Sequence, residues 1–330
     1  YTAMIIVSYV GAKLIINSGA SEMGVGALSS MFTYGMQILS SLMMLSMIFV
    51  MITISNASIQ RICEVLTEES TIENPENPKT DVPDGSIDFN GVSFKYHADA
   101  EKNALTDINL HIRSGETIGI IGGTGSSKSS LIQLISRLYD ATEGEVLVGG
   151  SNVKDYNIET LRNAVSVVLQ KNVLFSGTIK ENLRWGDMNA TDEELVRVCK
   201  LAQADEFINS LPDGYDTHIE QGGTNVSGGQ KQRLCIARAL LKKPKIIIFD
   251  DSTSAVDTKT DALIRNALAT EIPDTTKIII AQRISSVQDA DRVVVMEDGR
   301  INAVGTHDEL LESNEIYKEV YYSQNKAGEE

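Results

Sequence analysis

The sequence predicts a membrane-spanning α-helical segment followed by an α/β domain with a helical subdomain. Three observations predict this order. An uncharged apolar segment lies near the N-terminus, a proline-rich stretch follows it, and short β-branched runs then alternate with amphipathic stretches. The chain has 330 residues, which suits about two domains. We expect membrane helices and a stalk at residues 1–70, a linker at 71–85 and the α/β domain at 86–330.

The first element is a predicted transmembrane helix at residues 31–54. No charged residue occurs between Met23 and Gln60, and the apolar segment is long enough to cross a hydrocarbon core of ~30 Å at ~1.5 Å per residue. A buried helix of a soluble core is the alternative, but such helices rarely stay uncharged over this length. The sequence therefore favours a membrane span.

A second apolar stretch, "YTAMIIVSYVGAKLIINSGA", opens the chain. It begins without an initiator methionine and without the basic region that starts a signal peptide, so we interpret it as the remainder of another span. We accordingly expect the chain to be a fragment of a multi-pass membrane protein.

The predicted helix continues beyond the membrane as a stalk. Apolar residues keep a helical spacing between Ile59 and Leu66 while charged residues appear among them. The following stretch, "TIENPENPKTDVPDG", holds three of the six prolines, and proline cannot continue a helix. This stretch therefore predicts an extended linker and the domain boundary.

The charge balance excludes one class of partner. The formal net charge is −16, from 29 Lys and Arg against 45 Asp and Glu, whereas binding along a nucleic-acid backbone needs a basic face. We therefore expect no nucleic-acid partner. The cysteines fit no metal-ligand spacing and the histidines are scattered singly, so we expect reduced structural thiols and ordinary histidines. These residues are Cys63, Cys199, Cys235, His97, His111, His218 and His307.

The α/β domain is predicted from alternating patterns. Half-buried strands fit residues 86–96 and 104–112, and the later apolar runs are typical of a parallel sheet covered on both faces. Helical spacing marks the segments between them. The interior strands are expected at 116–122, 245–251, 276–282 and 292–297, and the helices at 129–139, 191–211 and 259–272.

A phosphate-binding loop is predicted at residues 122–130, "GGTGSSKSS". It follows a buried strand and precedes a helix, so backbone N–H groups and a helix N-terminus would face an anion. Lys128 would add a positive charge, and the Ser129 hydroxyl could ligate Mg²⁺. Ser127 stands where this motif usually has glycine. Because a serine in the left-handed region costs ~1–2 kcal/mol, we expect a right-handed backbone there.

Two further segments have the features of an anion or metal site. Asp250 ends the predicted strand "KIIIFD", where its carboxylate can hold Mg²⁺. In "NVSGGQKQRLCIARALLKKP", Ser227, Gly228 and Gly229 would cap a helix that runs through Arg238. A single nucleotide does not need two helix N-termini so far apart in the chain, so one bound nucleotide does not account for both.

The order of these motifs resembles the ATP-binding domain of ABC transporters. The motifs are "GGTGSSKSS", "VVLQKNVLFSGTIKENL", "VSGGQKQR", "IIIFDDSTSAVD" and "IIIAQR", and the preceding helix, stalk and linker look like a bacterial exporter half-transporter. In that family two such domains pair head to tail, and each ATP lies between the Walker motifs of one chain and the signature motif of the other. The resemblance implies ATP and Mg²⁺ as cofactors, ATPase activity coupled to export, and a second half-transporter chain as partner.

The resemblance also implies a role for each matching position. Tyr96 would stack on adenine, Gln170 would link Mg²⁺ and the attacking water to the membrane-domain contact, and Asp257 would lie in the loop that crosses between the two sites. The signature residues 227–230 would reach the γ-phosphate bound by the partner. The segment "HIEQGGTN" occupies the exporter-specific loop that touches the membrane domain, although its sequence departs from the commoner form. The positions implied to contact nucleotide are Tyr96, Gly122, Gly123, Thr124, Gly125, Ser126, Ser127, Lys128, Ser129, Ser130, Ser227, Gly228, Gly229, Gln230, Asp250 and Asp257, and those implied to hold the metal are Ser129, Gln170 and Asp250.

Two departures concern the implied catalytic positions, which are Gln170, Asp251 and Gln282. Most family members carry glutamate where this chain has Asp251 and histidine where it has Gln282. An aspartate carboxylate is withdrawn by about one C–C bond, and a misplacement of ~1 Å can cost ~10²-fold in rate. A glutamine cannot become cationic or shuttle a proton. We therefore expect a slow or non-hydrolytic site in this chain beside an intact signature motif.

Three hypotheses follow. The first is one half of a heterodimeric exporter in the cell membrane, with lipid around its spans and the nucleotide-binding domain in the cytoplasm. The second is a catalytically silent regulatory nucleotide-binding subunit, whose complex would show no ATPase activity. The third, a soluble ABC-type ATPase acting on DNA or ribosomes, is opposed by the uncharged segment and the acidic balance. Apolar drugs, lipids and peptides all stay open as the exported substrate.

Overall fold

The computed structural model describes residues 1–19, 21, 23–252 and 256–326. Its chain divides into two compact units, Tyr1–Thr71 and Ile72–Glu330. Within the stretch "IIIFDDSTSAVD", residues 253–255 lie outside the described residues.

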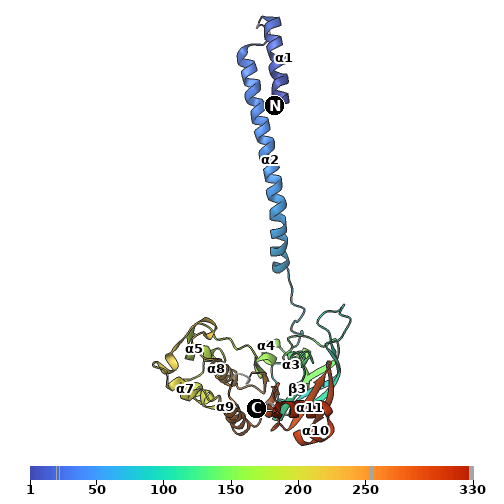
Figure 1. The fold of residues 1–330 in the computed structure, drawn as a ribbon, viewed down its shortest axis with the longest axis vertical. Coiled ribbons are helices and arrows are strands. Elements are labelled where there is room, and N and C mark those ends of the chain that lie inside the picture. The colour runs from blue at the N-terminus through green and yellow to red at the C-terminus, as the bar shows by residue number, and fades with distance from the viewer. Residues whose placement is uncertain (20, 22, 253–255, 327–330) are drawn as a thin grey trace. The chain divides into compact units, whose positions relative to one another are not determined.

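The described part of the N-terminal unit is helical, with α1 at Thr2–Ser18 and α2 at Val25–Leu66 (Figure 1). The two helices approach closely at Gly11, where a Cβ atom would lie 2.4 Å from the Cδ1 atom of Leu28. α1 ends at Gly19, whose φ of 58° is a left-handed conformation that glycine adopts without strain. α2 continues unbroken through the predicted stalk, as the helical spacing of its apolar residues predicts.

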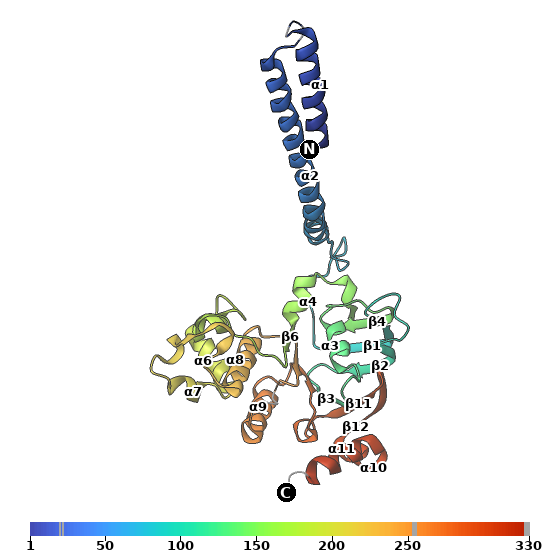
Figure 2. The same cartoon turned by 45° about the horizontal axis from the view of Figure 1, so that its top comes forward.

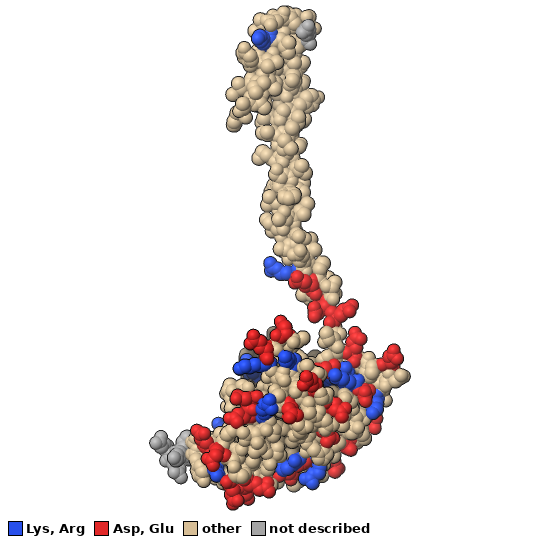
Figure 3. Space-filling model, turned by 90° about the vertical axis from the view of Figure 1, so that its right-hand side faces the viewer, with Lys and Arg blue, Asp and Glu red and all other residues tan. Residues whose placement is uncertain are grey.

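By length and composition, α2 can cross a membrane. Its 42 residues extend about 63 Å at about 1.5 Å per residue, roughly twice the thickness of a hydrocarbon core. None of its residues is buried within the chain. On the face drawn in Figure 3, uncharged residues cover most of this unit and charged ones gather toward the end of α2. The apolar surface suits lipid or other membrane helices, and the charged last turns suit water.

A six-stranded sheet runs through the second unit. Five of its strands are parallel, and β12 runs antiparallel along one edge. In order across the sheet the strands are β12 (Arg300–Gly305), β11 (Arg292–Glu297), β3 (Thr117–Gly122), β10 (Thr276–Ile280), β9 (Ile246–Asp250) and β6 (Val165–Val168). A four-stranded antiparallel sheet has the order β2 (Leu105–Ile112), β1 (Ile87–Phe94), β4 (Glu143–Val148) and β5 (Ser151–Asn152). The interior strands lie where the β-branched runs predict them.

Alternate residues of the interior strands pack into two different cores. Ile118 and Ile120 of β3 belong to a core shared with the four-stranded sheet and with α3 (Lys128–Ile135). Ile121 belongs instead to a core shared with helices from the rest of the unit. Because successive side chains of a strand point to opposite faces, the six-stranded sheet is covered on both faces, as its continuous apolar runs predict.

The remaining helices flank the sheets or form the helical subdomain, which lies between β6 and β9 in the chain (Figure 2). The stretch predicted as helical at 191–211 forms two helices, because Gln203 has a left-handed φ of 54° that ends the first of them. Likewise α3 stops at Ile135, short of the predicted Tyr139, since Arg137 has a φ of 49°. The helices of the subdomain are α5 (Ile179–Arg184), α6 (Asp192–Leu201), α7 (Asp205–Asn209) and α8 (Gly228–Leu241), and the others are α4 (Ile158–Ala164), α9 (Thr258–Glu271), α10 (His307–Ser313) and α11 (Glu315–Lys326).

Candidate nucleotide-binding site

The predicted phosphate loop connects β3 to α3, between Gly122 and Lys128. Its backbone shows that one expectation was wrong: Ser127 has φ 67° and ψ 26°, in the left-handed region rather than the right-handed one. The chain turns from the strand into α3 at this point, and Ser127 is the N-cap residue of that helix. The geometry of the turn therefore outweighs the residue's own preference, at a cost of about 1–2 kcal/mol.

The Lys128 ammonium group folds back onto the loop. Its Nζ donates to the carbonyl oxygens of Gly122 and Gly123 at 2.8 and 2.9 Å. Burial lowers the pKa of Lys128, and the nearby carboxylates of Asp250 and Asp251 oppose that effect. A phosphate in the loop would replace these neutral acceptors by charged oxygens, to which an ammonium group bonds more strongly.

Asp250 and Ser129 lie side by side although they are far apart in the chain. β9 and β3 both pair with β10 in the parallel sheet, so their carboxyl ends lie at one edge. The Ser129 hydroxyl donates to Asp250 Oδ2 at 3.1 Å. Burial raises the pKa of Asp250, and the hydrogen bond from Ser129 opposes that rise. A hydroxyl and a carboxylate oxygen in this position are the hard ligands that Mg²⁺ prefers.

Asp251 is held between two glutamines. Gln170 Nε2 and Gln282 Nε2 each donate to Asp251 Oδ2 at 2.9 Å. The Asp251 backbone has a left-handed φ of 47°, and its N–H donates to the carbonyl oxygen of Ile280 at 2.9 Å. The three residues follow the neighbouring strands β6, β9 and β10. The structure therefore brings all three implied catalytic positions together.

The loop has room for a phosphate group. A Cβ atom at Gly123 or Gly125 would meet nothing within 4 Å, so the loop backbone is open at these positions. The N-terminus of α3 adds a partial positive charge. Among the described residues, no group of three or more His, Cys, Asp and Glu side chains could hold a metal. The implied ligands Ser129, Gln170 and Asp250 would hold Mg²⁺ together with phosphate and water oxygens, which is how this ion usually binds nucleotides.

Tyr96 lies beside the phosphate loop. Its hydroxyl oxygen is 2.7 Å from Ser130 Oγ, on the first turn of α3. The ring makes edge contacts with Phe94 and Tyr139 at centroid distances of 4.8 and 5.1 Å, and the residue remains 46% exposed. An exposed aromatic ring next to a phosphate site is the arrangement that stacking on adenine requires.

The signature segment forms the start of α8, as predicted. Ser227 Oγ accepts the Gln230 N–H at 3.3 Å, and Gln230 Oε1 accepts the Ser227 N–H at 2.9 Å, which makes a reciprocal cap. Asp257 caps α9 in a similar way, because its Oδ1 accepts the Thr260 N–H at 3.0 Å. These two segments are therefore both helix N-termini.

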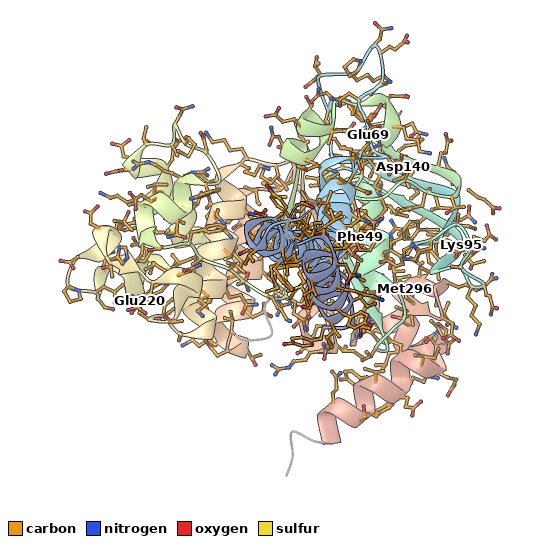
Figure 4. The ribbon with its side chains drawn as sticks, turned by 90° about the horizontal axis from the view of Figure 1, so that it is seen from above. Phe49, Glu69, Lys95, Asp140, Glu220 and Met296 are labelled. Atoms are coloured by element: carbon orange, nitrogen blue, oxygen red, sulfur yellow. The ribbon has the colours of Figure 1, made fainter. Side chains whose placement is uncertain are left out.

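The chain does not bring the signature segment to its own phosphate loop. Figure 4 shows Glu220, in the loop that precedes the signature, well separated from Met296 within the second unit. Met296 is the β11 residue in register with Gly122, at the start of the phosphate loop. The two anion-binding helix N-termini thus belong to different parts of the unit.

The loop "HIEQGGTN" packs against the segment that follows Gln170. β8 (His218–Ile219) pairs with β7 (Gly177–Thr178), and the Gly222 N–H donates to the carbonyl oxygen of Leu174 at 2.9 Å.

Sequence reasoning missed Gln324 in α11, which forms hydrogen bonds with the backbone of Gln282 and Ile284. No local motif marks that residue.

The comparisons with known proteins agree with this geometry. Residues 105–254 match the family model described as ABC transporter. The ABC transporter ATP-binding protein YfiB of Bacillus subtilis (strain 168) is 42% identical over 309 residues, which are 94% of this chain and 53% of that protein. A Staphylococcus aureus (strain NCTC 8325 / PS 47) ATP-binding/permease protein named for multidrug export is 44% identical over 263 residues, 79% of this chain and 45% of that one.

A solved structure gives the same result for the fold. The structure of a bacterial Atm1-family ABC exporter with ATP bound is 31% identical, with a TM-score of 0.77, and the match covers 97% of this chain and 56% of that one. The chain therefore spans about half the length of the relatives that it matches. Within that half it carries an ABC transporter ATP-binding domain, preceded by a helical segment in an Atm1-like exporter fold.

Proposed function

We propose that the chain is an ATP-binding and permease subunit of an ABC exporter, one half of a heterodimer. Its own ATP site would turn over slowly, and its signature motif would complete the site of the partner. The protein would cross the cell membrane several times and keep the nucleotide-binding domain in the cytoplasm. The observation that carries the proposed asymmetry is the pair of amide hydrogen bonds to Asp251 Oδ2.

A general base has to accept a proton from the attacking water, so its oxygen must be well placed. In this chain Asp251 Oδ2 already accepts hydrogen bonds from Gln170 and Gln282. Neither amide can take up the proton in turn. The aspartate side chain is also shorter than glutamate, and a displacement of ~1 Å can cost ~10²-fold in rate. These features support a site that binds ATP and Mg²⁺ and hydrolyses slowly.

The second anion-binding helix N-terminus supports the proposed partner. α8 begins at the signature segment and lies in the helical subdomain, apart from α3, which follows the phosphate loop (Figure 2). A nucleotide held by another chain would give that N-terminus a ligand. The names of the Staphylococcus aureus relative and of the Atm1-family structure support export as the process.

An exposed apolar patch beside Gln170 supports contact with a membrane domain. Phe175 and Trp185 stack with ring centroids 4.7 Å apart, yet they remain 44% and 64% exposed. A cavity of about 330 Å³ lies along the same surface, lined in part by Trp185. Patches of exposed aromatic residues mark protein contacts. Leu169 and Val173 extend the patch.

The same hydrogen bonds to Asp251 favour a second candidate, a catalytically silent regulatory subunit. In that case the complex with the partner would hydrolyse no ATP. The first proposal instead keeps the partner's site active, because the signature motif of this chain is intact.

The test compares two variants in the complex purified with its co-expressed partner. Ser227→Arg breaks the reciprocal cap and places a bulky charge where a γ-phosphate would meet backbone N–H groups, so most ATP hydrolysis is expected to be lost. Asp251→Asn should leave most of the turnover, because a misplaced base has little transition-state stabilisation to lose.

The outcomes separate the candidates. A complex silenced by Asp251→Asn alone would show that this carboxylate is an ordinary base and would refute the slow site. An unmodified complex that binds ATP without hydrolysing it would establish the regulatory subunit instead.

A further inference from the structure

The last turn of α11 forms hydrogen bonds with the backbone of residues 281–284, the loop that follows β10. We call these residues the switch loop. Gln324 donates from Nε2 to the Gln282 carbonyl oxygen at 2.7 Å and accepts the Ile284 N–H at Oε1 at 2.9 Å. The side chain of Gln282 in turn donates to Asp251 at 2.9 Å. One amide group therefore fixes the loop backbone on both sides of Arg283, directly behind the side chain that contacts Asp251.

The helix that carries Gln324 is well anchored. Tyr317, in the first turn of α11, is 0% exposed, and its hydroxyl lies 2.8 Å from His307 Nδ1. Val320 and Tyr321 pack against the core that contains Ile279 of β10. A cavity of about 300 Å³ borders Asp251, Gln282 and Gln324, so there is space beside the switch loop. Without the two hydrogen bonds, this loop could move while α11 stays in place.

We propose that Gln324 is a positioning residue that sets where the Gln282 amide meets the terminal phosphate of a bound nucleotide. The proposal rests on the proposed ATP site. Tyr96, which the proposed site assigns to the base, contacts Ser130, whereas Gln282 contacts Asp251, next to the proposed metal ligand Asp250. In that placement the terminal phosphate, which ADP lacks, would lie nearest to Gln282. Loss of the Gln324 contacts therefore weakens the binding of ATP more than the binding of ADP.

The experiment uses the full chain with its partner and two measurements. The first is hydrogen exchange of the Ile284 amide without nucleotide, which should rise about tenfold in Gln324→Ala because that amide loses its acceptor. The second is the ratio of ATP to ADP affinity, which should fall about three- to tenfold, the effect of one lost hydrogen bond. Ser323→Ala, an exposed position on the same turn, should change neither.

A second variant separates the two contacts. Gln324→Glu keeps an acceptor for the Ile284 N–H but has no donor for the Gln282 carbonyl oxygen, so Ile284 should stay protected while the preference for ATP falls. Unchanged exchange at Ile284 in Gln324→Ala would overturn the proposal. Faster exchange with an unchanged affinity ratio would overturn it as well. Failure of the ATP site itself would look different, because Lys128→Ala would then leave the binding of both nucleotides unaltered.

Discussion

Replacing Ser127 by glycine should stabilise the ATP-binding domain. At φ 67° a serine costs about 1–2 kcal/mol relative to right-handed geometry, and glycine carries no such penalty. The Ser127 side chain makes no cap hydrogen bond that the substitution would remove. Glycine also has more conformational freedom than serine in the unfolded chain, and this lowers the gain in stability by about 0.4–1 kcal/mol. The expected net increase in the free energy of unfolding is about 0.8 kcal/mol, the middle of a range of about 0–1.6 kcal/mol.

Urea unfolding followed by the fluorescence of Trp185 measures this change, because Trp185 is the single tryptophan and lies in this domain. Ser210→Gly is the matched control. Ser210 has φ −80° and its hydroxyl donates to the Phe207 carbonyl oxygen at 2.6 Å, so glycine there should lower stability. A midpoint that falls or stays constant in Ser127→Gly would refute the assignment of backbone strain to this serine.

Three other changes test the site and its surroundings. Lys128→Ala should weaken nucleotide binding in a filter or fluorescence assay, and an unchanged affinity would remove the phosphate-loop interpretation. Burial alone would raise the pKa of Glu116, but hydrogen bonds from Arg292 and from the Arg113 N–H lower it below its ordinary value of 4.5. The stability from Glu116 is therefore complete above that value and is lost as the pH falls through the lower folded pKa, so Glu116→Gln should flatten the acid limb of a plot of unfolding midpoint against pH. Asp251→Glu together with Gln282→His should raise hydrolysis at this chain's own site, measured as ADP release.

The interior strands and the phosphate loop could be predicted because their signals are local. A continuous run such as "KIIIFD" indicates a strand buried on both faces, and glycines before a lysine indicate the loop. Backbone conformations imposed by the tertiary structure could not be predicted in this way. Ser127 and Gln203 both have positive φ values where the pattern favours ordinary geometry, because the chain has to turn there to pack its helices.

The candidate site shows the same division. The identities of Asp250, Asp251 and Gln282 could be found from motif order, and adjacent parallel strands explain why their side chains meet. The two hydrogen bonds that Asp251 Oδ2 accepts from Gln170 and Gln282 depend on side-chain directions, which the spacing of residues in the sequence does not specify. The contacts of Gln324 depend on where α11 packs against the loop that follows β10, and that position results from core packing around Tyr317.

The substitutions Asp251→Glu and Gln282→His have to be combined because one hydrogen bond joins the two side chains. Gln282→His alone replaces the amide donor to Asp251 Oδ2 by an imidazole but leaves the carboxylate short. Asp251→Glu alone extends the carboxylate toward amides that cannot relay a proton, at a φ of 47° that glutamate tolerates less well than aspartate. Residues that act as a unit are not additive, so each single change should do little. A complex that also carries Ser227→Arg isolates the effect, since that change is expected to disable the proposed site of the partner and to leave only this chain's own. If the double restoration releases ADP no faster than Ser227→Arg alone, the residues at positions 251 and 282 do not limit hydrolysis at this site.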